Sequence, residues 1–405
     1  MTALADQPWL TARATRAVMA ALEAAGGPGC ARFVGGCVRN ALLEQPIDDI
    51  DIATTLRPEE TDRAIRAAGL KAVPTGMAHG TVTAVSERMP FEITTLRRDV
   101  STDGRNATVA FTDDWVEDAA RRDFRLNAVY ADGHGAIYDP TGQGVADALA
   151  GRIVFVGEAE TRVREDYLRI LRFFRFFAWY GRGAPDATAM QACASLAPGM
   201  TRLSAERVSK ELLKLLAALE PLGAVEAMRA AGVLDIVLPE HSGLERFTAL
   251  QSQSPDAVLR LMALLPSDTT VLRAVSVRLR LSNAVRDRMT DGARAFALVS
   301  LDMSEAQARA AIYRHGAAAF EDAVRLRGAE ATGREADTLR LIAVAETWAI
   351  PILPVSGRDL ARLGVEQGPD TGRILKAFEA DWIAADFPAH GHEARLAALI
   401  TPPPG

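Results

Sequence analysis

Short apolar runs and amphipathic segments alternate over the first 150 residues of the chain. Alternating or β-branched runs predict strands, and apolar spacing of three to four residues predicts helices. The predicted strands are 31–36, 49–55, 71–75, 80–86 and 90–97. The predicted helices are 8–25, 37–44 and 57–69, the last with Pro58 in its first turn. This order predicts an α+β domain built on a small sheet.

The pattern changes after residue 97. Residues 99–106 read DVSTDGRN, a polar stretch with a glycine that predicts a mobile loop. A capped helix is predicted to start at residues 113–114, and a hairpin at 128–140. After residue 157 nearly every segment has amphipathic spacing, so the rest is predicted to be helical. The most distinctive segment is 161–181, TRVREDYLRILRFFRFFAWYG, and no internal repeat is visible.

Composition narrows the class of protein. The chain has 405 residues, 49% of them hydrophobic, which is enough for more than one core. A formal net charge of −6 excludes a simple basic nucleic-acid binder, so any RNA contact must come from local arginine clusters. The 3 cysteines form no CxxC pair, and no apolar run approaches the roughly 18 residues of a membrane span. No signal-peptide pattern precedes the first helix, so we expect a soluble cytoplasmic protein.

The stretch PIDDIDIATT places three aspartates in an apolar run. Residues two apart share a strand face, so Asp49 and Asp51 are predicted to lie together, with Asp48 on the other face. Adjacent carboxylates repel unless a cation lies between them, and Mg²⁺ prefers such oxygens together with phosphates. Glu92 could supply a third carboxylate from a neighbouring strand. A solvated strand end or a turn is the alternative explanation.

Gly35 and Gly36 precede a predicted helix, where backbone N–H groups can hold a phosphate. Arg39 would lie in the first turn, near the same phosphates. A tight turn would explain the two glycines equally well. In RRDFRLNA, Arg122 can fork onto phosphate oxygens and Asp123 can accept from ribose hydroxyls. The alternative is a solvated Arg–Asp pair.

These motifs together resemble the bacterial-type (class II) tRNA nucleotidyltransferase and poly(A) polymerase family. The resemblance covers roughly residues 30–210, and less specific motifs extend it to the tail. The motifs that carry it are FVGGCVRNALLEQPIDDIDIATT, FEITTLRRD, DGR, RRDFRLNAVY, DPTGQGVADALAGRI and REDYLRILRFFRF.

The resemblance implies a polymerase-β-like nucleotidyltransferase head with a small mixed sheet, then an all-helical neck, body and tail. We expect the head at 1–150, the neck at 151–215, and the tRNA-binding body and tail at 216–405. The implied reaction is template-independent addition of CCA to the tRNA 3′ end from CTP and ATP, with Mg²⁺ as cofactor. No membrane and no obligate protein partner are expected.

The resemblance also assigns roles to residues. Asp49 and Asp51 match the metal-binding pair, with Glu92 as the candidate third carboxylate. Gly35, Gly36 and Arg39 would meet the nucleotide phosphates. The segment with Arg122, Asp123 and Asn127 would bind ribose and triphosphate. Arg172 is expected either to bind phosphate or to have a structural role.

Asp166 and Arg169 would select the base, and their i,i+3 spacing predicts one helix face. Cytosine and adenine each present an amino donor beside a ring acceptor, which a carboxylate and a guanidinium match. Uracil and guanine reverse that pattern and would leave polar groups unpaired. An intrahelical salt bridge is the alternative.

Two positions depart from the family pattern: Arg125, where threonine is usual, and Asn40, where aspartate is usual. The rival functions are a poly(A) polymerase, a partial adder of CC or A, and a catalytically silent RNA-binding protein. Residues 99–106 resemble the flexible element that full CCA-adders retain. The 6 histidines form no His–Asp cluster of the kind an appended phosphohydrolase domain would need.

Overall fold

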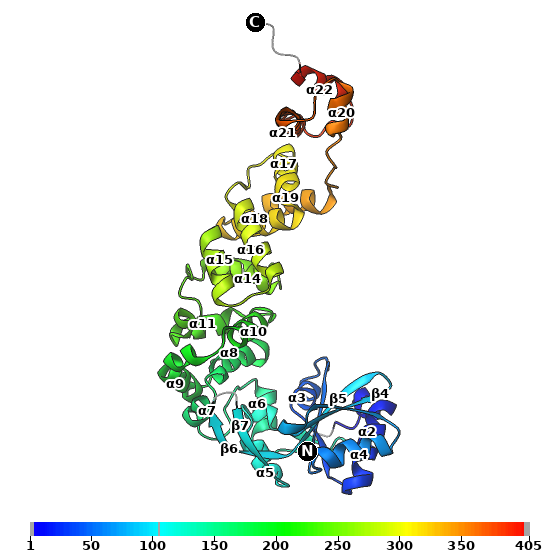
Figure 1. Cartoon of the computed structure of the whole chain (residues 1–405). Helices are drawn as coiled ribbons and strands as arrows, with labels where there is room; N and C mark the ends of the chain where they lie inside the picture. The colour runs from blue at the N-terminus through cyan, green and yellow to red at the C-terminus, as the bar shows by residue number, and fades with distance from the viewer. Residues whose placement is uncertain (1–3, 104–105, 401–405) are drawn as a thin grey trace. The chain divides into compact units, whose positions relative to one another are not determined.

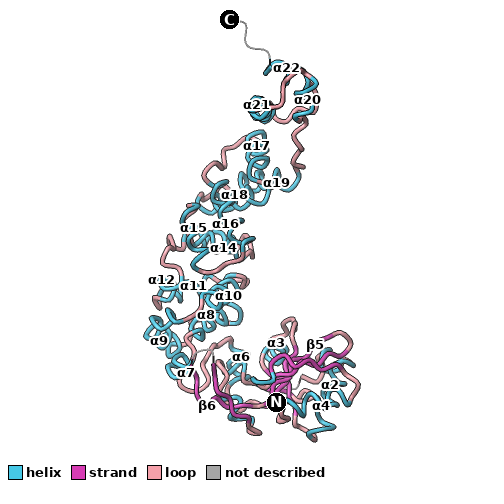
Figure 2. Tube along the Cα trace, viewed as in Figure 1, coloured by secondary structure: helices cyan, strands magenta, loops and turns pink. Residues whose placement is uncertain are grey.

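The computed structural model describes residues 4–103 and 106–400, which fall into two compact units. The first unit is Met1–Pro239 and the second is Glu240–Gly405. Strands occur only near the start of the described chain, and the rest is helical (Figures 1 and 2). The predicted α+β head followed by helices is therefore confirmed.

The head contains a seven-stranded mixed sheet with the order β3-β4-β5-β2-β1-β8-β9. Strands β2 and β5 run parallel, and the other neighbouring strands run antiparallel. The strands are β1 (Ala31–Val34), β2 (Ile50–Thr54), β3 (Lys71–Gly76), β4 (Thr81–Ser86), β5 (Met89–Thr95), β8 (Tyr130–Ala131) and β9 (Ile137–Tyr138).

Alternation along the strands builds a core on each face of the sheet. Ile52 of β2 and Phe33 of β1 belong to the larger core, which also contains Val18 of the opening helices. The next residues, Ala53 and Val34, belong to a second core on the opposite face. Asp51 is one residue from Ile52, so the alternation places it on that second face.

Short helices complete the head. The predicted opening helix is interrupted at Ala12, which has ψ 137°. Pro58 begins its helix as predicted, and the Glu60 carboxylate accepts from Arg57 N at 2.8 Å. The helices are α1 (Pro8–Thr11), α2 (Arg13–Gly26), α3 (Gly36–Leu42), α4 (Pro58–Ala67), α5 (Trp115–Ala120) and α6 (Gly144–Ala150), with 3₁₀ turns η1 (Met77–His79) and η2 (Arg125–Asn127).

The prediction of a loop at 99–106 was wrong for most of that segment. Strands β6 (Arg97–Asp103) and β7 (Asn106–Phe111) pair antiparallel in a separate two-stranded hairpin. Residues 104–105 lie outside the described chain. Polar residues and one glycine indicated a loop, but valine and threonine on both arms favour extended pairing.

The first unit continues after the head through helices α7 to α12 and the 3₁₀ turn η3. Helix α10 packs against α8, and so does α11, and both belong to the first unit, which ends at Pro239. Phe124 of the head stacks among Phe155, Phe173 and Phe176, which ties head and neck together. The elements are α7 (Ala159–Glu165), α8 (Leu168–Tyr180), α9 (Ala187–Leu196), η3 (Ala197–Arg202), α10 (Ala205–Leu216), α11 (Leu222–Ala230) and α12 (Val233–Val237).

The second unit is helical throughout its described part. Its last three helices enclose a core around Phe378 and Trp382. In the described residues, no helix is long and apolar enough to cross a membrane. The helices are α13 (Glu245–Gln251), α14 (Ala257–Leu264), α15 (Thr269–Arg278), α16 (Asn283–Phe296), α17 (Glu305–His315), α18 (Ala317–Glu330), α19 (Glu335–Thr347), α20 (Gly357–Arg362), α21 (Pro369–Ala384) and α22 (His392–Ile400).

All three cysteines are buried free thiols. Burial raises the pKa of Cys30 and of Cys193, and it raises the pKa of Cys37 to about 11. The Cys37 thiol donates to the Val34 carbonyl at 3.4 Å, at the start of α3. These thiols are core residues.

Candidate active site

Two parallel strands bring carboxylates together. Asp51 of β2 and Glu92 of β5 are register partners, so their side chains lie on one face of the sheet. Burial raises the pKa of Asp51 to about 6; the charges of Glu92 and Asp49 add to this rise, and Arg122 opposes it. The sequence prediction that these three carboxylates gather is consistent with this coupling. Asp48 is exposed and precedes β2.

The donor set fits a hard divalent cation. Mutual repulsion between Asp51, Glu92 and Asp49 would be relieved by a metal ion between them. In residues 4–103 and 106–400, however, no three His, Cys, Asp or Glu side chains are gathered closely enough to hold an ion by themselves. The site therefore fits a metal that takes part of its oxygens from a phosphate-bearing ligand.

Gly35 lies beside these groups. It has a φ of +75°, a conformation that favours glycine, and α3 begins at the next residue. A Cβ at Gly35 would lie 3.8 Å from Asp51 Oδ2 and 3.9 Å from Arg122 Nη1. The glycine pair thus keeps the space between an acidic and a basic group open. Its predicted contact with phosphate stays a prediction.

Arg39 is placed differently from expectation. Its side chain is buried, and it donates to Asn127 Oδ1 at 2.6 Å and to the Tyr180 hydroxyl at 2.8 Å. The guanidinium also lies 4.1 Å from the centre of the Tyr180 ring. These contacts join α3 of the head to α8 of the neck. Arg39 therefore has a structural role, in which it holds Asn127 and the neck helix in place.

Arg122 faces the carboxylates from the end of α5. Its Nη2 and Nε donate to Asp118 Oδ2 at 3.0 and 3.2 Å, and Nε also donates to the Tyr130 hydroxyl at 3.2 Å. Burial opposes the charge of Arg122, but Tyr130 and Asp118 outweigh it and raise the pKa of Arg122. Arg122 is therefore charged, and Asp118 and Tyr130 hold its side chain in place. Asp118 was missed by sequence reasoning, although its position four residues before Arg122 on a helix was a usable signal.

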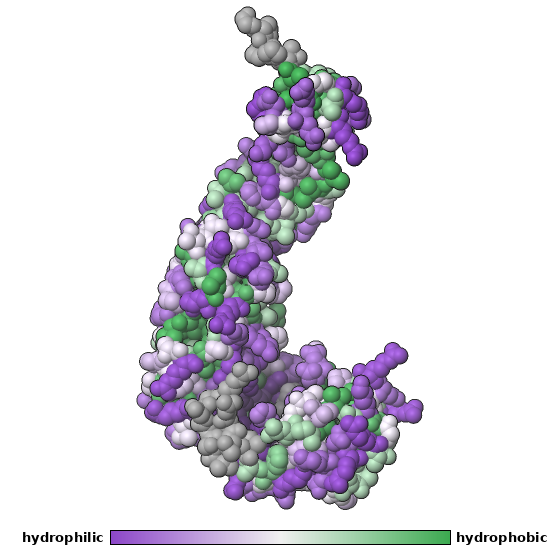
Figure 3. Space-filling view, viewed as in Figure 1, coloured by the Kyte–Doolittle hydropathy of each residue, from purple (hydrophilic) through white to green (hydrophobic). Residues whose placement is uncertain are grey.

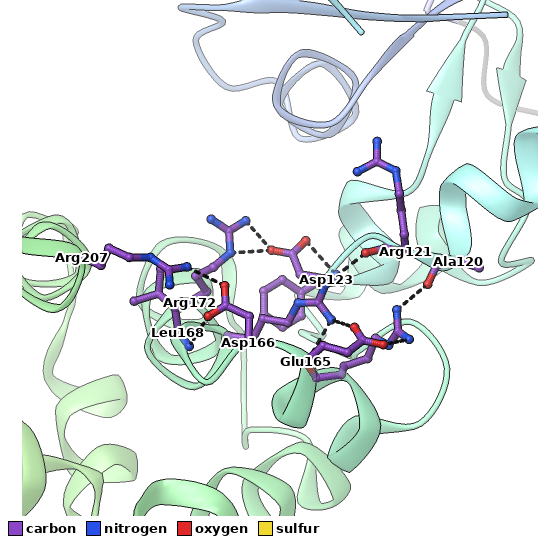
Figure 4. Close-up of polar contacts among 11 residues, drawn as sticks. Ala120, Arg121, Asp123, Glu165, Asp166, Leu168, Arg172 and Arg207 are labelled. Carbon is purple, nitrogen blue, oxygen red and sulfur yellow. Dashed lines mark hydrogen bonds and ion pairs between the residues drawn. The ribbon is translucent and has the colours of Figure 1, made fainter. Parts of the chain in front are cut away.

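Asp123 is held from three sides. Its Oδ1 accepts from Phe124 N at 2.8 Å and from Asn127 Nδ2 at 3.0 Å, and its Oδ2 accepts from Arg172 Nε at 2.8 Å. Burial would raise the pKa of Asp123, but Arg172 and the hydrogen bonds outweigh it and lower this pKa to about 2. The predicted residues Asp123, Asn127 and Arg172 thus form one connected group at the junction of head and neck. Figure 4 shows the contact between Asp123 and Arg172.

Asp166 and Arg169 do not share a helix face, and that prediction was wrong. Helix α7 ends at Glu165, and Asp166 has φ −154° and ψ 106°, so it lies in the break before α8. Asp166 Oδ1 accepts from Leu168 N at 3.1 Å. Arg169 donates to the Arg121 carbonyl at 3.2 Å and pairs with Glu165. The alternative of an Asp166–Arg169 salt bridge is also wrong.

Two further residues hold this pair of side chains in place. Arg207 of α10 donates to Asp166 Oδ2 at 2.6 Å (Figure 4). Glu165 binds Arg169 and also Arg162. Ser204 is the N-cap residue of α10, but its side chain makes no capping hydrogen bond. Asp166 and Arg207 are 41 residues apart in the sequence, so their contact could not be predicted from local spacing.

The surface is hollowed beside α3 and α6 in the first unit, and hydrophilic residues gather there (Figure 3). Carboxylates on the sheet, a held arginine and a polar neck segment thus occur within one compact unit. Such an arrangement can bind a metal-complexed phosphate and present polar groups to a base.

Comparisons with known proteins agree with this geometry. The family described as Poly A polymerase head domain matches residues 31–154, and the one described as Probable RNA and SrmB- binding site of polymerase A matches residues 185–244. CCA tRNA nucleotidyltransferase 1, mitochondrial, of Mus musculus is 32% identical over 371 residues, which cover 87% of this chain and 82% of that protein. The chain belongs to the tRNA nucleotidyltransferase and poly(A) polymerase family.

Bacterial members of the tRNA nucleotidyltransferase family are also similar. The CCA-adding enzyme of Geobacillus stearothermophilus is 39% identical over 220 residues, which cover 53% of this chain and 52% of that one. The crystal structure of the Bacillus stearothermophilus CCA-adding enzyme in complex with CTP has a TM-score of 0.78 and 28% identity, covering 96% of this chain and 97% of that chain. As a member, the protein is a nucleotidyltransferase of a family that depends on a divalent metal.

Both departures from the tRNA nucleotidyltransferase pattern have defined contacts. Asn40 Oδ1 accepts from Arg39 Nη2 at 2.9 Å, while its Nδ2 donates to the Pro46 carbonyl at 2.7 Å. The hydrogen bonds to Arg39 are thus kept without an ion pair. Arg125 Nη1 donates to Gln143 Oε1 at 2.7 Å, on the side of η2 that faces α6.

Proposed function

We propose that this protein adds CCA to the 3′ end of tRNA, using CTP and ATP as substrates and Mg²⁺ as cofactor. The observation that carries the proposal is the register of β2 with β5, which sets Asp51 beside Glu92, with Asp49 one residue before the strand. The similarity to CCA tRNA nucleotidyltransferases over 87% of the chain supports the substrate assignment.

The tRNA 3′-hydroxyl attacks the α-phosphate in line, and pyrophosphate leaves. Asp49 and Asp51 would hold Mg²⁺, which when bound would lower the pKa of the attacking hydroxyl and offset the charge of the triphosphate. Glu92 adds negative charge at the same face, and Arg122 offers a fixed guanidinium to the phosphates. Gly35 keeps side chains away from the space between them.

Base choice is assigned to Asp166 and Arg169. The carboxylate accepts from the amino group of cytosine or adenine, and the guanidinium donates to the adjacent ring nitrogen. Because Asp166 is held by Arg207 and Arg169 by Glu165, the two groups are spaced by the protein before a nucleotide binds. Uracil and guanine would place like groups against them. Arg172, held by Asp123, supports this junction.

The deciding experiment incubates the protein with tRNA that lacks CCA and with each labelled nucleoside triphosphate. Addition of C, C and A in order supports the proposal. Products ending in CC, or a single A on tRNA ending in CC, identify a partial adder. A long A tail identifies a poly(A) polymerase, and no product with retained tRNA binding identifies a silent RNA-binding protein. The cytoplasmic location stays a prediction.

A further inference from the structure

Asp118 is a buried carboxylate that no sequence motif singled out. It lies in α5, and its side chain is 1% exposed. Its Oδ1 accepts from Arg121 Nε at 2.8 Å and from Arg97 N, the first residue of β6, at 3.3 Å. Its Oδ2 accepts from Tyr130 at 2.7 Å and from Arg122. One carboxylate therefore joins the base of the hairpin, the sheet and two arginines.

These contacts divide the guanidinium of Arg122 into two sides. Nε and Nη2 are turned to Asp118 and Tyr130. Nη1 lies near Gly35 and, within the described part of the chain, has no hydrogen-bond partner. Asp51 Oδ2 is close to the same point above Gly35. Asp118 thus leaves one donor of Arg122 aimed at the space where Gly35 and Asp51 meet.

We propose that Asp118 is a positioning residue for nucleotide binding, which holds Arg122 with Nη1 directed at the phosphates of the incoming nucleotide. This inference rests on the proposed function, because it takes the space beside Gly35 and Asp51 as the triphosphate site. The same carboxylate fixes the base of the hairpin to this arginine through Arg97 N.

Holding Arg122 serves two purposes. A free arginine side chain has many rotamers, and fixing it beforehand lowers the entropic cost of binding a phosphate. A released Arg122 would also be drawn to Asp51, since its charge already acts on that carboxylate. It would then compete with the metal for Asp51. Loss of Asp118 should therefore weaken both nucleotide and metal binding.

The test uses the full-length protein and measures the dissociation constants of CTP and of pyrophosphate by calorimetry in Mg²⁺. Asp118→Asn keeps the size of the side chain and removes its charge. We expect both dissociation constants to rise about 10-fold, and the Mg²⁺ concentration for half-maximal addition to rise as well. The factor by which kcat falls, measured at saturating CTP and Mg²⁺, should be smaller than the factor by which KM for CTP rises. In an Arg122→Gln background, Asp118→Asn should have no further effect on binding.

Asp147→Asn is the matched control, because Asp147 is also 1% exposed and paired with an arginine, Arg152, but lies in α6. It should lower the thermal midpoint as Asp118→Asn does and leave CTP binding within twofold of wild type. Tyr130→Phe removes the hydrogen bond to Asp118 Oδ2 and the one from Arg122 Nε, and it should weaken CTP binding about 3-fold. This variant is the test to use if Asp118→Asn does not fold.

Binding by Asp118→Asn within twofold of wild type would overturn the inference, and so would equal losses with Asp147→Asn or full additivity with Arg122→Gln. If Asp118→Asn does not fold, wild-type CTP binding by Tyr130→Phe overturns it. The proposed function fails separately, when wild-type protein binds no CTP or adds no nucleotide to tRNA.

Discussion

Asp51 is subject to opposing electrostatic effects within a few ångströms. Burial and the carboxylates of Glu92 and Asp49 disfavour its charge, and Arg122 favours it. A divalent cation would favour the charged form strongly. A bound cation would therefore offset the effects of burial and of the neighbouring carboxylates on the charge of Asp51.

We predict that Asp51→Asn abolishes nucleotide addition while the protein stays folded. Loss of a metal ligand should cost several kcal/mol of transition-state stabilisation, on the order of a 1,000-fold fall in kcat/KM. The measurement combines single-nucleotide addition kinetics with thermal unfolding. Asp48→Asn is the control and should be nearly wild type, because Asp48 is exposed and outside β2. Near-normal addition by Asp51→Asn would refute the metal assignment.

The second residue-scale prediction concerns base choice. Asp166→Ala should reduce discrimination against UTP, and Arg169→Ala should impair CTP and ATP together. Each lost charged hydrogen bond is worth roughly 1.5 to 3 kcal/mol, or about 10- to 150-fold in kcat/KM. Arg207→Ala should reproduce a weaker form of the Asp166 effect, since Arg207 holds that carboxylate.

The measurement is kcat/KM for all four nucleoside triphosphates on tRNA that ends before CCA. Arg164→Ala is the control, because Arg164 is in the same segment and pairs with Glu160 on the surface. Unchanged preference for CTP and ATP in the Asp166 and Arg169 variants would show that the base is recognised elsewhere.

A third prediction follows from the pKa of Asp118, which burial would raise but Arg122, Arg121 and Tyr130 together lower to about 2. A carboxyl whose pKa is lower in the folded state stabilises the fold above its unfolded pKa of about 3.9 and loses that contribution as pH falls toward 2. The contribution is about 2.6 kcal/mol. Urea unfolding of wild type and Asp118→Asn between pH 7 and pH 2.5 should give curves that converge in acid; parallel curves would contradict the prediction.

Local spacing in the sequence predicted part of the site. It could not predict contacts between residues that are far apart in the sequence. Strand alternation made it possible to predict the direction of the Asp51 and Glu92 side chains, which are register partners, whereas Asp49 lies just before β2. The Asp123–Arg172 pair joins residues 49 apart, and only the folded chain brings them together. The i,i+3 argument for Asp166 and Arg169 assumed an unbroken helix, and the break at Asp166 removed its basis.

At the scale of elements, patterns with a clear period were predicted well. Strands β2, β4 and β5 and helix α4 lie within a few residues of their predicted bounds. The hairpin of β6 and β7 was missed because its polar residues resemble those of a loop, and strand pairing depends on a partner that the local pattern does not show. The break between α7 and α8 contains no proline or glycine, so nothing in the sequence indicated that the helix ends there.

The hairpin supplies an element-scale prediction. Deleting residues 102–105 should reduce addition of A more than addition of C, leaving tRNA that ends in CC. The motive is the resemblance of 99–106 to the family's switching element, together with the attachment of the hairpin base to Asp118 through Arg97 N. Product lengths on sequencing gels give the measurement. Equal loss of both additions would instead assign the hairpin a general structural role.

At the scale of the whole molecule, the chain consists of two compact units that meet in sequence at residues 239–240. The groups assigned to nucleotide binding all lie in the first unit. We therefore predict two thermal transitions in calorimetry, of which only one rises on addition of CTP and Mg²⁺. At a CTP concentration 100 times the dissociation constant, the shift corresponds to about 2.7 kcal/mol. A single transition, or an equal shift of both, would show that the units unfold together.

The buried cysteines have a practical consequence for experiments. The thiolate is the form of cysteine that attacks alkylating reagents, and the three native thiols are buried and have raised pKa values. New cysteines at exposed positions such as Glu59 in the first unit and Asp370 in the second would then be the fast-reacting sites. A donor and an acceptor dye could be attached there without replacing any core residue. Energy transfer between the dyes would follow the separation of the two units during each round of nucleotide addition.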